Sequence, residues 1–381
     1  MDFFSRHATR SHIAIDLGSH SIKTAIFEKP AASIIPTNIQ KITTDVTHAS
    51  RGSSLLARLH ELIAAVLKEK SHIPGKIVIG ISPNIADISL QSWTVDSLRV
   101  RERFTLAHIQ KYVQELIDKY QNETHAFLSY PVSIEINGYA VDIHSFVARD
   151  PSLIKEITLR AVMVQCTDEV ALEFNTIKKM LGGIEIEFVP LPVVTAETLI
   201  KTCTIRDALL IDVGGSITTL MFIHDGRLVQ FVSFPVGTQR FSHHIVKTRG
   251  GKFVEADDVT HQYSHGLISK DEQKELSHIF SEEAAEWKKA FMTALEACYP
   301  IAPLPEDFYL YGGGSYIPEV RSALWDRDIF KNFSPFESPH VHIVQVSHMF
   351  NGDSLKGIIR GPEDVGVASL MYHSLYPTPL F

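Results

Sequence analysis

The sequence contains little cysteine. Three cysteines occur among its 381 residues, Cys166, Cys203 and Cys298, and none of them belongs to a CxxC pair. This spacing favours neither a disulfide framework nor a zinc site. Because sparse, unpaired cysteine is typical of proteins that fold in a reducing compartment, we expect a cytoplasmic protein.

Long apolar runs and an excess of basic residues are also missing. No uninterrupted apolar stretch reaches the roughly 18 residues of a membrane-spanning helix, and MDFFSRHATRSH at the N-terminus leads into no apolar signal segment. The formal net charge of -8 leaves no broad positive field to drive sequence-independent binding of nucleic acid. We therefore expect no spanning helix, no signal peptide and no nucleic-acid partner.

Several motifs of common phosphate-binding and catalytic sites are absent. The sequence has no Walker A loop, no GxGxxG, no GxSxG and no HExxH. Its 19 histidines follow no metal-binding arrangement, so we expect structural or surface roles for them. A phosphate site in this chain would have to be built from other elements.

One pattern occurs twice in the sequence. IAIDLGSHSIKTAIFE spans residues 13–28, and ALLIDVGGSITTLMFIHDGRLVQF spans residues 208–231. In each segment an apolar strand ends in aspartate, a glycine turn follows, and a second strand begins. The pattern predicts two β-hairpins of the same kind.

A third glycine turn, GGGS at 312–315, follows an apolar strand at 308–311. The segment 83–167 differs from the rest, because short alternating strands there flank one helix. Its expected elements are strands at 88–93, 134–143 and 160–164 and a helix at 105–120. Elsewhere the pattern predicts helices at 53–70, 168–181, 193–202, 237–247, 271–299 and 366–372, and strands at 76–81, 184–189 and 341–346. Residues 255–270 are polar and are assigned no element.

Glycine turns after strands are suited to binding phosphate. Glycine has no Cβ and accepts positive φ, so successive backbone N–H groups can approach phosphate oxygens closely. Asp16 and Asp212 would face the same cleft and hold Mg²⁺ through water, because a carboxylate does not face a triphosphate directly. We expect the three turns to clamp one nucleotide, the third beside the nucleoside. The predicted binding residues are Asp16, Gly18, Ser19, His20, Ser21 and Lys23, then Asp212, Gly214, Gly215, Ser216 and Thr218, and finally Gly312, Gly313 and Gly314.

The three motifs resemble those of a known superfamily. DLGSHSIK, DVGGSITT and YLYGGGSYIP are similar to the phosphate-1, phosphate-2 and adenosine motifs of actin, heat-shock chaperones and sugar kinases. The resemblance covers about residues 13–372. Within the superfamily the sequence is most similar to FtsA of bacterial cell division, with PilM of type IV pilus assembly as a near relative. ATP and Mg²⁺ are the cofactors that this resemblance implies.

The fold that the resemblance implies is α/β, with two actin-like (ribonuclease H-like) halves around a nucleotide cleft and a small inserted α+β domain. We expect half I to comprise residues 1–82 and 168–205. An FtsA-type insert would occupy 83–167, and half II 206–381.

The residues leave the choice within the superfamily open. SYPVSIEINGYAVD at 129–142, IEIEFVPLPVVTAETLI at 184–200 and PVGTQRFSHHIV at 235–246 resemble FtsA. GSHSIK and the pair Thr218-Thr219 are closer to PilM, since FtsA-type sequences commonly carry Thr-Asp there. We place an FtsA-like scaffold first, a PilM-like pilus platform second and a small-molecule kinase of the superfamily third.

Turnover of the nucleotide is expected to be slow or absent. Hydrolysing members place an acid or glutamine near the attacking water, whereas Leu191 stands where FtsA-like sequences often have glutamate and Thr219 replaces an acid. Lys23 is either a phosphate contact or an exposed hairpin residue, and Glu197 is interpreted as a surface helix residue. His20 and Ser216 add bulk to their turns, so loss of nucleotide binding is a further alternative.

The resemblance also implies a self-associating scaffold at the inner face of the cytoplasmic membrane. The chain ends in YHSLYPTPLF, which is too short and too broken by proline for the terminal amphipathic helix usual in FtsA-like proteins. We therefore expect peripheral, indirect membrane contact through a partner, either an FtsZ-like tubulin homologue or a PilN-like membrane peptide.

Overall fold

The structure is a computed structural model of the whole chain. It describes residues 11–29, 36–45, 53–69, 74–96, 126–141, 154–298, 304–330, 338–350 and 357–377, together with a few single positions between 111 and 122 and at 333 and 355.

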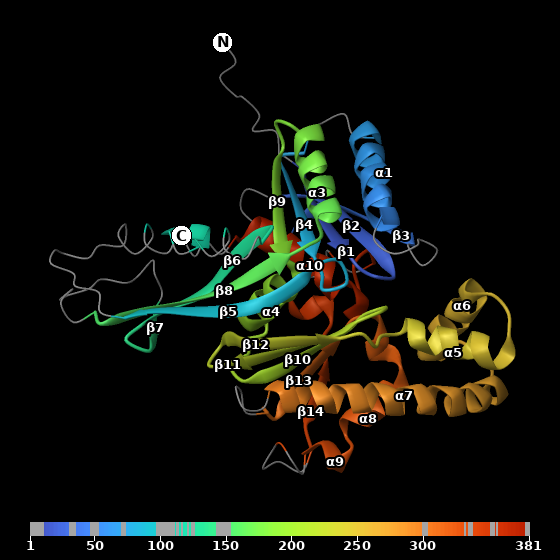
Figure 1. Cartoon of the computed structure of the whole chain (residues 1–381). Coiled ribbons are helices and arrows are strands. Elements are labelled where there is room, and N and C mark those ends of the chain that lie inside the picture. Colours follow the sequence, from blue (N-terminus) through green and yellow to red (C-terminus); the bar gives the residue numbers. More distant parts are fainter. Residues whose placement is uncertain are drawn as a thin grey trace.

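The first half is built on a five-stranded sheet with the order β3-β2-β1-β4-β9. Its strands are β1 (Ser11–Leu17), β2 (Ser21–Glu28), β3 (Thr37–Asp45), β4 (Lys76–Ile81) and β9 (Glu185–Pro190). β1 pairs antiparallel with β2 and parallel with β4, and nearly every residue of β1 is buried, as its apolar run predicts. Helices α1 (Ser53–Glu69) and α3 (Asp168–Met180) lie together over one face of this sheet (Figure 1).

The second half repeats this sheet with the order β12-β11-β10-β13-β14. Its strands are β10 (Ala208–Val213), β11 (Thr218–His224), β12 (Arg227–Phe234), β13 (Asp307–Tyr311) and β14 (His340–Ile343). Here β10 pairs antiparallel with β11 and parallel with β13, so each sheet has three antiparallel strands followed by two parallel ones. The prediction of an α/β fold with two related halves is confirmed.

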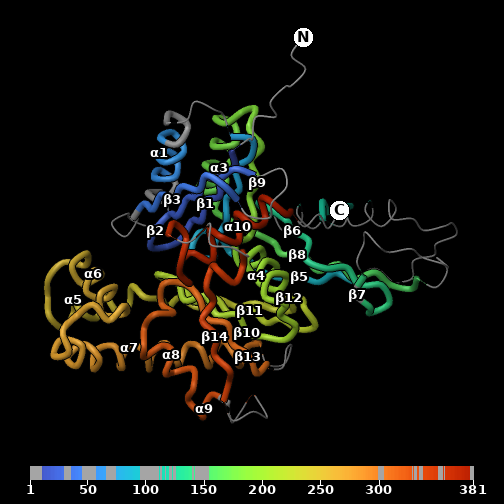
Figure 2. The backbone as a smooth tube through the Cα atoms, turned by 180° about the vertical axis from the view of Figure 1, so that it is seen from behind, coloured from blue at the N-terminus to red at the C-terminus, as the bar shows by residue number. Residues whose placement is uncertain are grey.

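Helices cover the second sheet on the side away from the first half. The long helix α7 (Lys270–Cys298) and α8 (Pro318–Leu324) lie along it, and α9 (Arg327–Phe330) follows. Helices α5 (Gln239–Arg249) and α6 (Phe253–Ser264) project together to one side of the second sheet (Figures 1 and 2). The buried Trp287 of α7 donates its indole N–H to Thr218 Oγ1 over 3.0 Å, which fixes α7 to β11.

Two helices lie between the sheets. α4 (Leu191–Thr202) and α10 (Val365–Leu375) pack against each other; α10 also contacts β1 and β4, and α4 contacts β11 and β12. Alternating side chains of β10 enter different cores, since Leu210 joins the core that contains α10 whereas Leu209 and Ile211 join the core under α7. Because α10 packs on the first sheet, we propose that half I also includes residues 365–375.

A third sheet extends from the first half, with the order β5-β8-β6-β7 (Figure 1). It consists of β5 (Asp87–Asp96), β6 (Leu128–Ile136), β7 (Tyr139–Val141) and β8 (Glu156–Gln165), all antiparallel. This sheet lies within the predicted insert, whose bounds stay a prediction. Most of the helix expected at 105–120 lies outside the described residues.

The sequence patterns missed two elements that border the cleft. β3 was assigned no structure, because TNIQKITTD does not alternate regularly. α6 occupies the first part of the polar segment 255–270, and its buried residues are only Ala256, Thr260 and Tyr263. Tertiary contacts therefore decide both elements.

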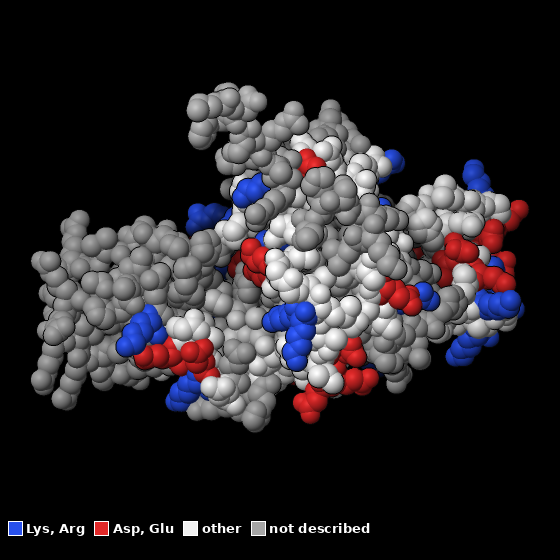
Figure 3. Space-filling view, turned by 90° about the horizontal axis from the view of Figure 1, so that it is seen from above, with Lys and Arg blue, Asp and Glu red and all other residues white. Residues whose placement is uncertain are grey.

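Over the described residues, no helix is long and apolar enough to cross a membrane. On the face seen in Figure 3, acidic and basic side chains of the described residues lie interspersed.

Candidate functional site

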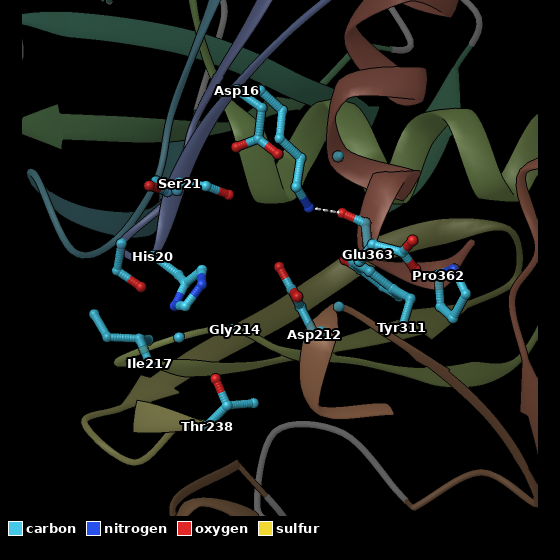
Figure 4. A pocket seen from close by; sticks show the side chains of 18 of the residues that line it. Asp16, His20, Ser21, Asp212, Gly214, Ile217, Thr238, Tyr311, Pro362 and Glu363 are labelled. Carbon is cyan, nitrogen blue, oxygen red and sulfur yellow. Dashed lines mark hydrogen bonds between the residues drawn. The ribbon is translucent and has the colours of Figure 1, made fainter. Parts of the chain in front are cut away.

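A cavity of about 370 Å³ lies between the two halves. Its volume falls in the range of small-molecule sites. Eleven predicted binding residues line it: Asp16, Gly18, Ser19, His20, Ser21, Lys23, Asp212, Gly214, Gly215, Gly312 and Gly313. Three distant parts of the chain thus converge on one space, as the sequence patterns predict (Figure 4).

The two hairpins present their acids in the same way. Asp16 pairs across the first hairpin with Lys23, and Asp212 pairs across the second with Thr219. In Figure 4 the carboxylates of Asp16 and Asp212 extend toward the same space from opposite halves. This arrangement follows from the repeated register, because both acids are one residue before the end of their strand.

Glycine is required where each hairpin turns. A Cβ on Gly18 would lie 2.7 Å from the carbonyl oxygen of Ser21, and one on Gly214 would lie 2.9 Å from that of Ile217. Both distances are shorter than real Cβ contacts, so a side chain at either position would force the turn to move. In the second turn the Gly214 N–H donates to the Ile217 carbonyl oxygen over 3.0 Å and closes the turn.

The two turns also touch each other. The Ser216 N–H donates to Ser19 Oγ over 2.9 Å, and the Gln239 side-chain amide donates to the Ser19 carbonyl oxygen over 3.3 Å. A Cβ on Gly215 would lie 2.8 Å from the Cβ of His20. Glycine at 215 therefore permits the close contact between the halves at this point.

The third turn closes the cavity under Asp212. Gly312 has φ +85°, and a Cβ there would lie 2.5 Å from Asp212 Oδ1. Its N–H donates to the Pro362 carbonyl oxygen over 3.0 Å. Gly313 borders the cavity, and nothing lies within 4 Å of the position its Cβ would take. This turn leaves room for a flat group against the backbone.

Three predicted residues do not border the cavity. Ser216 contributes its backbone to the contact between the turns. Thr218 is fully buried and donates to the Val236 carbonyl oxygen over 2.6 Å, so its role is structural. Gly314 lies against the side chain of Val213, which leaves no space for a Cβ.

Burial dominates the electrostatics of the two acids. It raises the pKa of Asp16 to about 6 and that of Asp212 to about 7. The charge of Asp16 raises the pKa of Asp212 further, whereas Lys23 lowers the pKa of both. Two acids held in this way are suited to a divalent cation, which would offset the cost of ionising them.

The donor set fits Mg²⁺ only together with a ligand. Among the described residues, no group of three or more His, Cys, Asp or Glu side chains is arranged to hold a metal. Mg²⁺ usually takes one or two carboxylates and completes its shell with water and phosphate oxygens. Asp16 and Asp212 match this requirement for a nucleotide-bound ion.

Lys23 enters the cavity and is not an exposed hairpin residue. Its Nζ donates to the Glu363 carbonyl oxygen (Figure 4) and lies 4.0 Å from Asp364 Oδ1. Lys41 of β3 forms a closer pair with the same carboxylate, at 2.6 Å from Oδ1. The segment before α10 is therefore tied to β2 and β3 by two lysines.

Sequence reasoning missed an aromatic wall near the third turn. His261 and His265 stack with ring centroids 4.2 Å apart, and His265 lies 4.4 Å from Tyr316. All three residues line the cavity. Their positions in the polar segment 255–270 and after the glycine turn gave no periodic signal, although histidines beside a predicted cleft could have been considered.

The residues near the start of α4 carry no obvious base. Leu191 and Thr219 line the cavity, together with Ser82 and Asn84 after β4. Glu197 lies further along α4, where it accepts a hydrogen bond from Tyr130 over 3.1 Å. Glu197 is half-buried and not exposed as expected, and burial raises its pKa to about 7.

Two sheets of the same order, joined by α4 and α10 around a cavity with three glycine turns, define an actin-like ATPase fold, and the chain has this fold. The structure is similar to that of the PilM-PilN type IV pilus biogenesis complex, with a TM-score of 0.63 and 13% sequence identity. The match covers 96% of this chain and 99% of that one. The FtsA-like choice is not tested by this similarity, which at such identity concerns the fold.

Two other solved structures match with lower scores. MreB 5 of Spiroplasma citri bound to AMPPNP has a TM-score of 0.47 and 12% identity, with 96% of each chain covered. The ethanolamine utilization protein EutJ from Carboxydothermus hydrogenoformans has a TM-score of 0.46 and 13% identity, with 94% of this chain and 89% of that one covered. No protein-family model matches the sequence, and no curated protein matches it.

Proposed function

We propose that this protein is an actin-like scaffold that binds ATP with Mg²⁺ in the cavity between its halves. The observation that carries the proposal is the convergence of three glycine turns, the buried Asp16 and the half-buried Asp212 on one cavity. Backbone amides in such turns suit phosphate oxygens, and the raised pKa values of the acids suit a cation held between them. His261, His265 and Tyr316 offer a flat surface for the base.

Asp16 and Asp212 would hold Mg²⁺, and the ion would neutralise charge on the phosphates. Lys23 would turn from the Glu363 carbonyl oxygen toward a phosphate, which is a stronger acceptor. A ligand that contacts both hairpins binds best when the halves are close together. Binding would thereby favour one relative position of the halves and regulate assembly.

We infer that hydrolysis is slow at most. Leu191 borders the cavity where the superfamily resemblance implies a water-orienting acid, and an alkyl side chain cannot orient water. Thr219 offers a hydroxyl, which is hydrogen-bonded with Ser233 at 2.9 Å. The nucleotide would act as a bound regulator more than as a substrate.

For the cellular role we place a PilM-like pilus platform first, because the structure is similar to the PilM-PilN complex with a TM-score of 0.63. A PilN-like membrane peptide would be the partner and would bring the protein to the inner face of the membrane. An FtsA-like division scaffold with an FtsZ-like partner is the second candidate, supported by the FtsA-like segments at 129–142 and 235–246.

The test is calorimetric titration of the purified protein with ATP and Mg²⁺, beside the Asp212→Asn variant. We expect binding by the wild type that depends on Mg²⁺, and at least a tenfold weaker affinity in the variant. Equal affinity in the two proteins would remove the second hairpin from the site. Phosphate transfer to an added sugar or acid would instead favour the small-molecule kinase.

The cellular role needs a separate experiment. We expect affinity capture from cells that express pilus components to recover a PilN-like membrane protein. Recovery of a tubulin homologue in its place would favour the division role.

A further inference from the structure

His20 reaches across the mouth of the cavity. It belongs to the first turn, and its Nε2 lies 3.4 Å from Asp257 Oδ2 on α6 of the second half. Both residues line the cavity, and His20 extends toward its interior in Figure 4. The pair therefore joins the halves at the rim of the candidate nucleotide site.

Asp257 is held in place from behind. Its Oδ1 accepts a hydrogen bond from the Ser242 hydroxyl over 2.9 Å, and Ser242 is fully buried on α5. The Ser242 hydroxyl also lies 3.0 Å from Thr260 Oγ1. The carboxylate thus offers its second oxygen to His20 from a fixed position, because α5 and α6 are joined beneath it.

The other nitrogen of the His20 ring is left for a ligand. Nδ1 is buried and has no hydrogen-bond partner within the described part of the chain. A buried imidazole nitrogen without a partner is costly, and a phosphate oxygen would satisfy it. Because Nδ1 is covered in this structure, a small rotation of the ring would have to open it to the cavity before it contacts a phosphate.

We propose that His20 and Asp257 form a clasp that closes the cavity over the phosphates of a bound nucleotide and slows its release. The inference rests on the proposed function, since it concerns nucleotide bound in the same cavity. His20 is a positioning residue in this account: it links the first turn to α6 and thereby keeps the halves together. Release of the nucleotide requires this link to break first.

The test is the dissociation rate of a fluorescent N-methylanthraniloyl ATP, displaced by excess ATP in a stopped-flow instrument. We expect His20→Ala and Asp257→Ala each to release the nucleotide about three- to fivefold faster, as the loss of one partly exposed side-chain contact predicts. The double variant should release it no faster than either single variant, because both changes break one contact.

Asp257→Ala separates the clasp from a simple charge effect. If His20 only attracts phosphate, removal of a negative charge beside it makes binding tighter and release slower, and this result would overturn the clasp. The clasp predicts faster release instead. His20→Lys should restore slow release when Asp257 is present and should not restore it in Asp257→Ala.

A matched pair outside the cavity provides the control. His224 Nδ1 lies 2.7 Å from Asp207 Oδ1 on the surface of the second half, so His224→Ala removes a similar contact and should leave release unchanged. If the wild type binds nucleotide and His20→Ala releases it at the wild-type rate, the clasp is wrong and the proposed function is unaffected. Failure of the wild type to bind nucleotide would overturn the proposed function and the clasp with it.

Discussion

The two hairpins have the same backbone and different side chains. DLGSHSIK and DVGGSITT align residue by residue, with the acid before the turn and the glycine two positions later. The glycines approach carbonyl oxygens three residues ahead in the same way, Gly18 toward Ser21 and Gly214 toward Ile217. Within these two motifs only the first carries basic side chains, His20 and Lys23, where the second has Ser216 and Thr219.

The difference indicates a division of labour between the halves. Both hairpins supply an acid, but the first adds basic side chains that enter the cavity, whereas the second adds glycine backbone and the Thr219 hydroxyl. This arrangement suits a phosphate site, because positively charged side chains on one half are enough to neutralise the phosphates. The second half then needs only to approach closely, which its glycines permit.

Removal of the Lys23 charge should have the largest effect. We expect Lys23→Met to weaken ATP binding about 10- to 100-fold, as the loss of a charged hydrogen bond predicts. Thr219→Val at the equivalent position of the second hairpin should weaken it by less than about threefold, since a neutral hydroxyl contributes less. Isothermal titration calorimetry measures both. Equal losses of affinity in Lys23→Met and Thr219→Val would contradict the asymmetry. Lys23→Arg keeps the charge and is the control for folding, and we expect it to have the melting temperature of the wild type.

The glycines test the part that the hairpins share. Gly18→Ala and Gly214→Ala should each lower the free energy of unfolding by about 1–3 kcal/mol, because each new methyl group meets a carbonyl oxygen. Gly313→Ala is the control, since nothing lies within 4 Å of its Cβ position. Urea unfolding followed by circular dichroism gives the three values. A large cost in only one hairpin would show that the turns are not equivalent.

The two acids predict a pH dependence of stability without ligand. Their pKa values of about 6 and about 7 in the folded protein exceed the ordinary 3.8, so the folded state holds protons that the unfolded state releases. The contribution of these two acids to the free energy of unfolding should therefore be highest below pH 4, and it should fall as the pH rises through 6 and 7.

Asp212→Asn removes this dependence for one acid. We expect the variant to be about 1–2 kcal/mol more stable than the wild type at pH 8 and little different at pH 4. Thermal unfolding at the two pH values measures the difference. A variant that is less stable at pH 8 would mean that Asp212 is ionised without cost.

Much of the fold was predictable because its strands are short apolar runs that end at glycine. The apolar strands that open the segments 13–28 and 208–231, the strand at 308–311 and the order of the three turns follow from such runs. β3 was not predictable, since Ile39 and Ile42 lie three residues apart and give no alternation. α6 was missed because only one side of it meets the core.

The candidate site was predictable in its backbone and less so in its side chains. Glycine after an acid marks the first two turns and a glycine run after an apolar strand marks the third, so Gly18, Gly214 and Gly312 could be placed from the sequence. The contact between His20 and Asp257 depends on how α6 packs beside the first half, and no local pattern encodes it. His265 and Tyr316 likewise meet only through the tertiary fold.

The smallest effect concerns the contact between the turns, where the same asymmetry recurs. The first hairpin contributes the side-chain oxygen of Ser19, and the second contributes the backbone N–H of Ser216. We expect Ser19→Ala to lower the free energy of unfolding by about 0.5–1.5 kcal/mol, because the N–H loses its acceptor. Ser216→Ala keeps the N–H and should stay within about 0.5 kcal/mol of the wild type in the same urea titration. If Ser216→Ala were the more costly change, the second hairpin would contribute more than its backbone, and the division of labour would be wrong at the point where the halves touch.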